Sequence, residues 1–150
     1  MLITPSGISI TRTIRATSDI HGAAAVPVFR IATGMVYLFG FVGQVTTAIG
    51  TGTTPDLKFI SNPTTGTTTD LCAALDTSND GIGTLYAMTG IITDALLRSE
   101  HGGIRDGLWG NPFIIPIGDI ESSSDEDVAG SVQLTAWWAP ITDGATLIAV

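Results

Sequence analysis

Apolar and polar residues alternate along much of the chain, as they do in β-strands that bury one face. The clearest alternation places Val132, Leu134, Ala136 and Trp138 on one face and Gln133, Thr135 and Trp137 on the other. Adjacent tryptophans in a strand point to opposite faces, so one joins the core and the other contacts water, a loop or another subunit. The tryptophan pair is therefore the strongest indication of an interface in the sequence.

Two further segments carry strand signals. Residues 35–45 hold large apolar side chains at both parities, which predicts a central strand covered on both faces. Pro27 lies inside the apolar segment 23–31, which predicts an edge or bulged strand there. The uncharged stretch 31–49 has the length of a membrane helix, but its Gly, Thr and Gln content favours one or two buried strands, broken near Gly40 or Gly43.

Turn-forming clusters separate these segments, at residues 50–55, 62–66 and 76–81. Residues 94–98 are the one stretch that predicts a helical turn, and residues 121–127 predict an acidic loop. The segments between these turns and loops amount to about eight short strands. The sequence therefore predicts an all-β fold, either a β-sandwich or a jelly-roll-like barrel.

The N-terminal segment 1–23 predicts an extended arm ahead of a single β domain at 24–150. Its isoleucines at positions 8, 10 and 14 are separated by polar residues, so the arm can pair within its own sheet or reach a neighbouring subunit. We expect deletion of residues 1–20 to leave a folded domain that has lost its assembly contacts. The predicted interface residues are Ile8, Ile10, Ile14, Trp109 and Trp137.

Composition narrows the class of function. Hydrophobic residues make up 44% of the chain and charged residues 13%, about half the usual globular share. A net charge of −8, with six scattered bases, argues against nucleic-acid binding. The one cysteine, Cys72, and the absence of a basic region before an apolar run at the start predict an intracellular origin. We expect no membrane association.

Candidate catalytic and metal-binding residues are few. His21 and His101 each lie beside glycine in loop-like segments, so we expect solvated side chains rather than general bases. Asp119 and Glu121 offer a carboxylate pair, but no neighbouring residues predict a sugar cleft. The 76–81 loop matches the first positions of a calcium-binding loop and lacks the acidic twelfth residue, which favours an Asx-type turn. We therefore expect no enzyme activity, cofactor or metal.

Two stretches carry a resemblance: NPTTGTTTDLCAALD at 62–76 and VQLTAWWAPITDGA at 132–145. Both resemble segments of small virion proteins of tailed bacteriophages, often encoded near the major capsid protein. Residues 94–112, which include Trp109, depart from that pattern. The matching runs cover roughly the middle and the C-terminal third, and they contain no catalytic signature.

The resemblance implies a head decoration, or cement, protein. Such a protein sits on the outer surface of the phage head, is made in the host cytoplasm, and bridges neighbouring subunits of the major capsid protein, commonly as a homotrimer. Low charge and abundant threonine are consistent with a surface largely covered by partners, and multivalency makes modest contacts stable. The alternatives are a head–tail, tail or fibre component, or a carbohydrate-binding β-module that uses Trp109 or Trp137.

Overall fold

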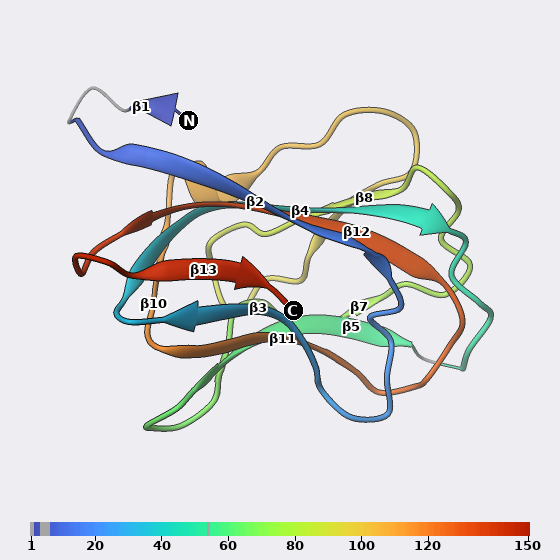
Figure 1. The fold of residues 1–150 in the computed structure, drawn as a ribbon. Coiled ribbons are helices and arrows are strands. Elements are labelled where there is room, and N and C mark those ends of the chain that lie inside the picture. The colour runs from blue at the N-terminus through green and yellow to red at the C-terminus, as the bar shows by residue number, and fades with distance from the viewer. Residues whose placement is uncertain (1, 4–6, 54) are drawn as a thin grey trace.

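Two antiparallel β-sheets pack face to face in the computed structural model, which describes residues 2–3, 7–53 and 55–150 (Figure 1). The predicted all-β fold is confirmed. The two sheets remain separate layers, so the fold is a β-sandwich and not a closed barrel. The described residues form thirteen strands, several of them only two or three residues long, where the sequence predicted about eight.

The first sheet has seven strands and contains the long strands of the fold. In spatial order they are β1 (Leu2–Ile3), β2 (Ser9–Ser18), β12 (Ser131–Pro140), β4 (Val36–Thr47), β8 (Leu85–Ala87) and β9 (Leu97–Ser99), and β10 (Phe113–Ile115) also pairs with β4. The predicted central strand is confirmed as β4, which lies between β12 and the two short strands β8 and β10. Its outer face is half-buried rather than fully covered.

The second sheet has six strands and packs beneath the first. In spatial order they are β13 (Thr146–Ala149), β3 (Val26–Ala32), β11 (Gly118–Ser124), β5 (Asp56–Pro63) and β6 (Thr69–Asp70), and β7 (Leu75–Asp76) also pairs with β5. Aromatic side chains fill the space between the sheets. The ring of Phe41 on β4 lies 5.9 Å from Phe29 on β3 and 4.7 Å from Phe59 on β5. Burying each such side chain contributes about 1.5–3 kcal/mol.

The alternation in β12 orients its side chains as predicted. Trp138 is buried in the core, and its indole nitrogen donates a hydrogen bond to Thr13 Oγ1 at 2.9 Å. Trp137 lies on the opposite, outer face and is half-buried. Of these two adjacent tryptophans, one therefore packs in the core and the other contributes to the outer face of this sheet.

Two predicted interruptions are β-bulges. In the β4–β12 ladder Trp137 faces Gly40 and Trp138 faces Leu38, so β4 carries one extra residue at this point. In the β3–β11 ladder the register shifts beside Pro27, which cannot donate a ladder hydrogen bond. Residues 31–49 thus contain the end of β3 and the whole of β4, and no helix in the described part of the chain is long and apolar enough to cross a membrane.

The N-terminal segment pairs within its own sheet, which is one of the two alternatives that the sequence left open. β2 runs antiparallel to β12 over most of its length, and Ile20, just beyond it, is fully buried. Thr13 and Arg15 on β2 also donate hydrogen bonds to the carbonyls of Leu147 and Val150, next to the edge of the second sheet. The expectation that residues 1–20 are dispensable for folding is therefore not supported by the packing.

Two local predictions are wrong. Residues 94–98 do not form a helical turn, because Leu97–Ser99 is strand β9, and the one helix among the described residues is the 3₁₀-helix η1 (Gly107–Trp109). Residues 121–124 are not a loop but the end of β11, in the middle of the second sheet. This polar strand is tolerated because its buried groups are bonded: Ser122 donates to the carbonyl of Ile20 at 2.8 Å.

Candidate functional site

Four aromatic side chains gather on the outer face of the seven-stranded sheet, and we call them the aromatic surface: Tyr37, Phe39, Trp109 and Trp137. The ring centroids are 5.6 Å apart for Tyr37 and Phe39, 6.3 Å for Phe39 and Trp109, and 6.4 Å for Trp109 and Trp137. These separations are typical of aromatic pairs in contact. The rings form one continuous row contributed by β4, η1 and β12.

Strand periodicity places three of these rings. Tyr37 and Phe39 are two residues apart on β4 and therefore share the outer face. Trp137 faces Gly40 across the ladder at the bulge, which brings the neighbouring strand's aromatic ring beside them. Trp109 comes from far along the chain, on η1, and its side chain is 45% exposed.

Gly40 provides the space in which η1 approaches the sheet. A Cβ atom on Gly40 would lie 2.8 Å from Asp106 Oδ2, 2.9 Å from a Trp137 ring carbon and 3.2 Å from the Trp109 indole nitrogen. All three distances are too short for a methyl group with its neighbours unmoved. Only glycine at this position allows both tryptophans and Asp106 to pack this closely on β4.

Asp106 fastens the segment before η1 to β4. Its Oδ2 accepts a hydrogen bond from the Phe41 backbone N–H at 3.0 Å, and its Oδ1 accepts one from the Leu108 N–H at 3.1 Å. Leu108 is fully buried, and the Gly107 N–H donates to the Met88 carbonyl at 2.9 Å. Burial raises the pKa of Asp106, and the two backbone N–H groups act in the opposite direction. The position of Trp109 is therefore fixed by a capped, anchored turn.

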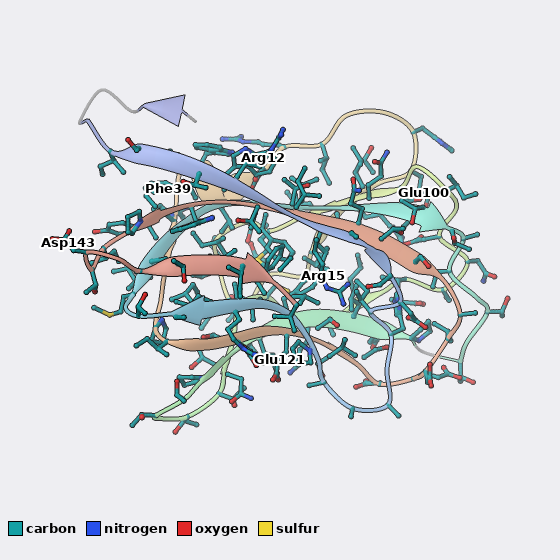
Figure 2. All side chains as sticks on the ribbon, viewed as in Figure 1. Arg12, Arg15, Phe39, Glu100, Glu121 and Asp143 are labelled. Atoms are coloured by element: carbon teal, nitrogen blue, oxygen red, sulfur yellow. The ribbon has the colours of Figure 1, made fainter. Side chains whose placement is uncertain are left out.

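Two arginines border the aromatic surface. Arg12 on β2 is the ladder partner of Trp137, and it lies on the same side of the molecule as Phe39 in Figure 2. Arg105 lies beside Trp109 in the wall of a shallow cavity of about 370 Å³, which is also lined by Asp106 and Asn111. Tryptophan, tyrosine and arginine are the residues most enriched at energetically important contacts in protein interfaces.

The predicted interface residues fall into different environments. Trp109 and Trp137 are brought together, and Ile14 is 45% exposed on β2, two residues from Arg12. Ile8 is half-buried, and Ile10 is 2% exposed, so the Ile10 side chain is not accessible on this chain. Sequence reasoning missed Tyr37 and Phe39 because it placed both in a fully covered strand. Their two-residue spacing was the available signal.

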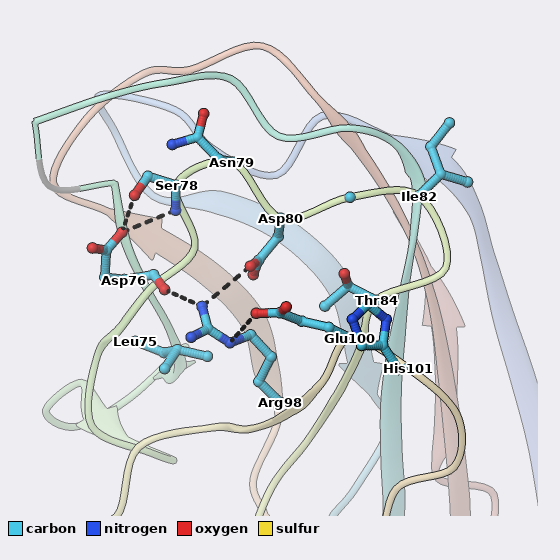
Figure 3. Close-up of a pocket in the computed structure, with 11 residues that line it drawn as sticks. Leu75, Asp76, Ser78, Asn79, Asp80, Ile82, Thr84, Arg98, Glu100 and His101 are labelled. Carbon is cyan, nitrogen blue, oxygen red and sulfur yellow. Dashed lines mark hydrogen bonds and ion pairs between the residues drawn. The ribbon is translucent and has the colours of Figure 1, made fainter.

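A second, larger cavity of about 670 Å³ lies beside the 76–81 loop (Figure 3). The predicted Asx-type turn is confirmed, because Asp76 Oδ1 accepts hydrogen bonds from the Ser78 N–H at 2.9 Å and the Ser78 hydroxyl at 2.7 Å. These bonds lower the pKa of Asp76. Asp80 is buried, and its two oxygens bind the Tyr86 hydroxyl and the Arg98 guanidinium, at 2.6 and 3.1 Å. Its carboxylate is thus already occupied by the protein.

The prediction that both histidine side chains are solvated agrees with the structure for His101 and is wrong for His21. His101 is exposed and lines the second cavity, but His21 is 1% exposed. The Thr77 hydroxyl donates to the Pro55 carbonyl at 2.8 Å, so its oxygen accepts from His21 Nε2, also at 2.8 Å. The remaining His21 nitrogen, Nδ1, has no hydrogen-bond partner among the described residues. Burial lowers the pKa of His21, which keeps the ring neutral.

The candidate carboxylate pair is held by separate partners. Asp119 forms a two-point ion pair with Arg30, at 2.8 and 3.1 Å, on the exposed side of β11. Glu121 is buried and accepts a hydrogen bond from the Asn62 amide at 3.0 Å. Cys72 is buried as well, and burial raises the pKa of its thiol to about 11. The described residues contain no cluster of three or more potential metal ligands.

The aromatic surface combines an exposed tryptophan, anchored geometry and two neighbouring exposed arginines, and it is the candidate functional site. Comparison with known proteins adds no family: no protein-family model, no curated protein and no solved structure matches this chain.

Proposed function

We propose that the chain is a structural virion protein that decorates the outer surface of a tailed-phage head. It bridges neighbouring subunits of the major capsid protein and assembles as a homotrimer. The observation that carries this proposal is the aromatic surface, four adjoining rings on the outside of a rigid sheet in a protein with few charges. The resemblance of residues 62–76 and 132–145 to phage virion proteins supplies the identity of the partner.

The surface of the chain supports an assembly role. The aromatic surface consists of one exposed ring, Trp109, and three half-buried rings, and it gains free energy when a partner covers the apolar area that remains in water. Large apolar side chains are also exposed elsewhere: Ile14, Met35, Ile91, Ile92, Ile114, Ile117, Ile141, Ile148 and Val150. Apolar exposure at so many separate places suits a protein that contacts more than one neighbour, as a bridging subunit does.

Rigidity supports the same role. Decoration requires many copies that each bind with modest affinity, so that the shell is stabilised by multivalency. A preformed surface loses little conformational entropy on docking. Trp109 is held by η1, by the Asp106 carboxylate and by close packing at Gly40, so its ring is already in place before a partner arrives.

The direct test is the composition of purified particles from a phage that encodes the chain. We expect the chain to be present in many copies, in a fixed ratio to the major capsid protein, and to lie on the outside of the head by electron microscopy. A few copies located at the neck or tail would support the head–tail or tail alternative instead. Absence from the particles would contradict both.

The binding surface is tested with Trp109→Ala, compared with Ile82→Ala as a control. Both side chains are exposed, so both variants should fold, and Ile82 lines the second cavity rather than the aromatic surface. We expect Trp109→Ala to lower occupancy on particles about tenfold or more, as for a hot-spot residue, and Ile82→Ala to leave it unchanged. Equal occupancy for the two variants would mean that another surface docks.

The carbohydrate-binding alternative is favoured by one observation, the cavity beside Trp109 that Arg105 and Asn111 line. An aromatic ring next to hydrogen-bonding groups is also a suitable wall for a sugar. A glycan array separates the two functions: specific binding that Trp109→Ala abolishes would support a carbohydrate-binding module.

A further inference from the structure

Four of the six basic residues have partners within the chain. Arg30 pairs with Asp119, Lys58 with Asp70, and Arg98 with Asp80, at 2.8, 3.0 and 3.1 Å. Arg15 donates to the Val150 carbonyl at 2.8 Å and also to Ser18. The other two, Arg12 and Arg105, are exposed and have no hydrogen bond or ion pair with any residue that the structure describes.

Arg12 and Arg105 both border the aromatic surface. Arg12 faces Trp137 across the β2–β12 ladder, and Arg105 shares a cavity wall with Trp109. The acidic group next to Arg105 in sequence is Asp106, which is half-buried with both carboxylate oxygens bound to backbone N–H groups. Asp106 is therefore bound to the backbone of the sheet and of the turn, and both guanidinium groups lie at the exposed surface of a chain of net charge −8.

We infer that the surface docking against the aromatic row is an acidic region of the shell protein, with carboxylates positioned to meet Arg12 and Arg105. This inference rests on the proposed function and adds the chemistry of the partner. Guanidinium groups bind carboxylates through two parallel hydrogen bonds, which fixes orientation as well as strength. Charge complementarity of this kind sets the register of docking and speeds encounter.

The distribution of charge decides between an acidic protein region and a nucleic acid. Beyond one Debye length, about 8 Å in physiological salt, only the local charge near the contact matters. A compact acidic region would contact the two arginines and would lie far from most of the acidic residues of this chain. A long polyanion would also meet the rest of the surface of a chain that has 14 acidic residues against six basic ones, and it would be repelled.

The test measures binding of the purified protein to particles of the encoding phage that lack it, at about 50 mM and about 500 mM NaCl. The double variant Arg12→Glu with Arg105→Glu reverses both free charges. A second double variant, Arg12→Gln with Arg105→Gln, removes the charges without adding acids. The control is Arg30→Gln with Lys58→Gln, which lowers the net charge by the same amount as the glutamine double variant but acts on paired bases of the second sheet.

We expect both arginine double variants to lower occupancy at low salt by about tenfold or more, and to flatten the dependence of occupancy on salt. The control variant should bind as the wild type does. One outcome would overturn the acidic partner and leave the proposed function standing. In that outcome Trp109→Ala loses binding, while the arginine variants bind as the wild type does and with the same dependence on salt. Failure of the wild type to bind particles would overturn both proposals. Binding of uronic-acid glycans that requires the arginines would replace the acidic protein region with an acidic sugar.

Discussion

At the scale of single residues, Gly40 links the sheet to the aromatic surface. We expect Gly40→Ala to displace Trp137 and η1, because the added Cβ would lie within 3 Å of Asp106 and Trp137. Overpacking of this kind costs about 1–3 kcal/mol of unfolding free energy. Chemical denaturation measures the loss, and tryptophan fluorescence reports the displaced rings. Gly103→Ala is the control, because nothing lies within 4 Å of its Cβ position, and an equal effect there would contradict the packing argument.

Tyr86 is the buried partner of Asp80, and its hydroxyl donates to that carboxylate at 2.6 Å. Tyr86→Phe removes the donor and leaves a buried oxygen with one partner fewer, which should cost about 1–3 kcal/mol of unfolding free energy. Tyr37→Phe is a matched control, because the Tyr37 hydroxyl has no hydrogen-bond partner among the described residues. Denaturation curves that shift equally for the two variants would count against a stabilising Tyr86–Asp80 bond.

His21 makes stability depend on pH. Burial holds its pKa in the folded protein below the ordinary value of 6.5, against the opposing effect of Asp19 and Asp127. The unfolded chain therefore binds a proton more readily, so the unfolding free energy should fall as pH drops below about 6.5 and level off below the folded pKa. His21→Gln can still donate to Thr77 and does not titrate. Denaturation at pH 7.5, 6.5 and 5.5 should show a flatter pH dependence for the variant, and identical slopes would refute the prediction.

Sequence reasoning at this scale succeeded where a residue's environment follows from strand parity, as for Trp137 and Trp138. It failed for His21, which occupies a loop-like stretch but is buried against Thr77, a residue 56 positions away. It also missed the role of Asp106, because capping of a single 3₁₀ turn leaves little pattern in a glycine-rich segment. Contacts between distant loops have no periodicity, so the sequence alone does not reveal them.

At the scale of elements, β2 connects the two sheets along one side of the sandwich. Thr13 accepts a hydrogen bond from the buried Trp138 indole and donates one to the Leu147 carbonyl at 3.1 Å. Thr13→Val keeps the shape and removes both bonds, so we expect a loss of about 1–3 kcal/mol of unfolding free energy. Thr11→Val on the same strand is the control, because Thr11 is exposed and forms no side-chain hydrogen bond within the described residues. A Thr13→Val variant as stable as Thr11→Val would contradict the connection.

The strands that the sequence predicted best are two long ones: β12, in which apolar and polar residues alternate, and β4, in which large apolar residues occupy both faces. The second half of β11, residues 121–124, was predicted to belong to a loop because its serines and acids do not look like a buried strand. Their polar groups are bonded by neighbours such as Asn62 and the Ile20 carbonyl, which only the folded chain brings near. The two-residue strands β6 and β7 are too short to carry any period.

At the scale of the whole molecule, the exposed apolar side chains predict self-association. We expect the free protein to be a trimer at micromolar concentration by light scattering, because the proposed bridging role uses several surfaces at once. Its molar mass should be insensitive to the Arg12→Glu and Arg105→Glu changes if those residues face the shell rather than another copy. A monomer under these conditions would contradict the trimer, and dissociation by the arginine changes would place the aromatic surface between copies.

The alternation of faces along β12 has a consequence for how this protein can diverge. Inserting one residue between Val132 and Trp137 would exchange the faces of the strand beyond the insertion, so Trp137 would be forced inward and Trp138 outward. We expect such a change to destabilise the fold. Descendants of this sequence can therefore replace one outer ring with another, but the place of the aromatic surface on the sheet is inherited together with the hydrophobic interior.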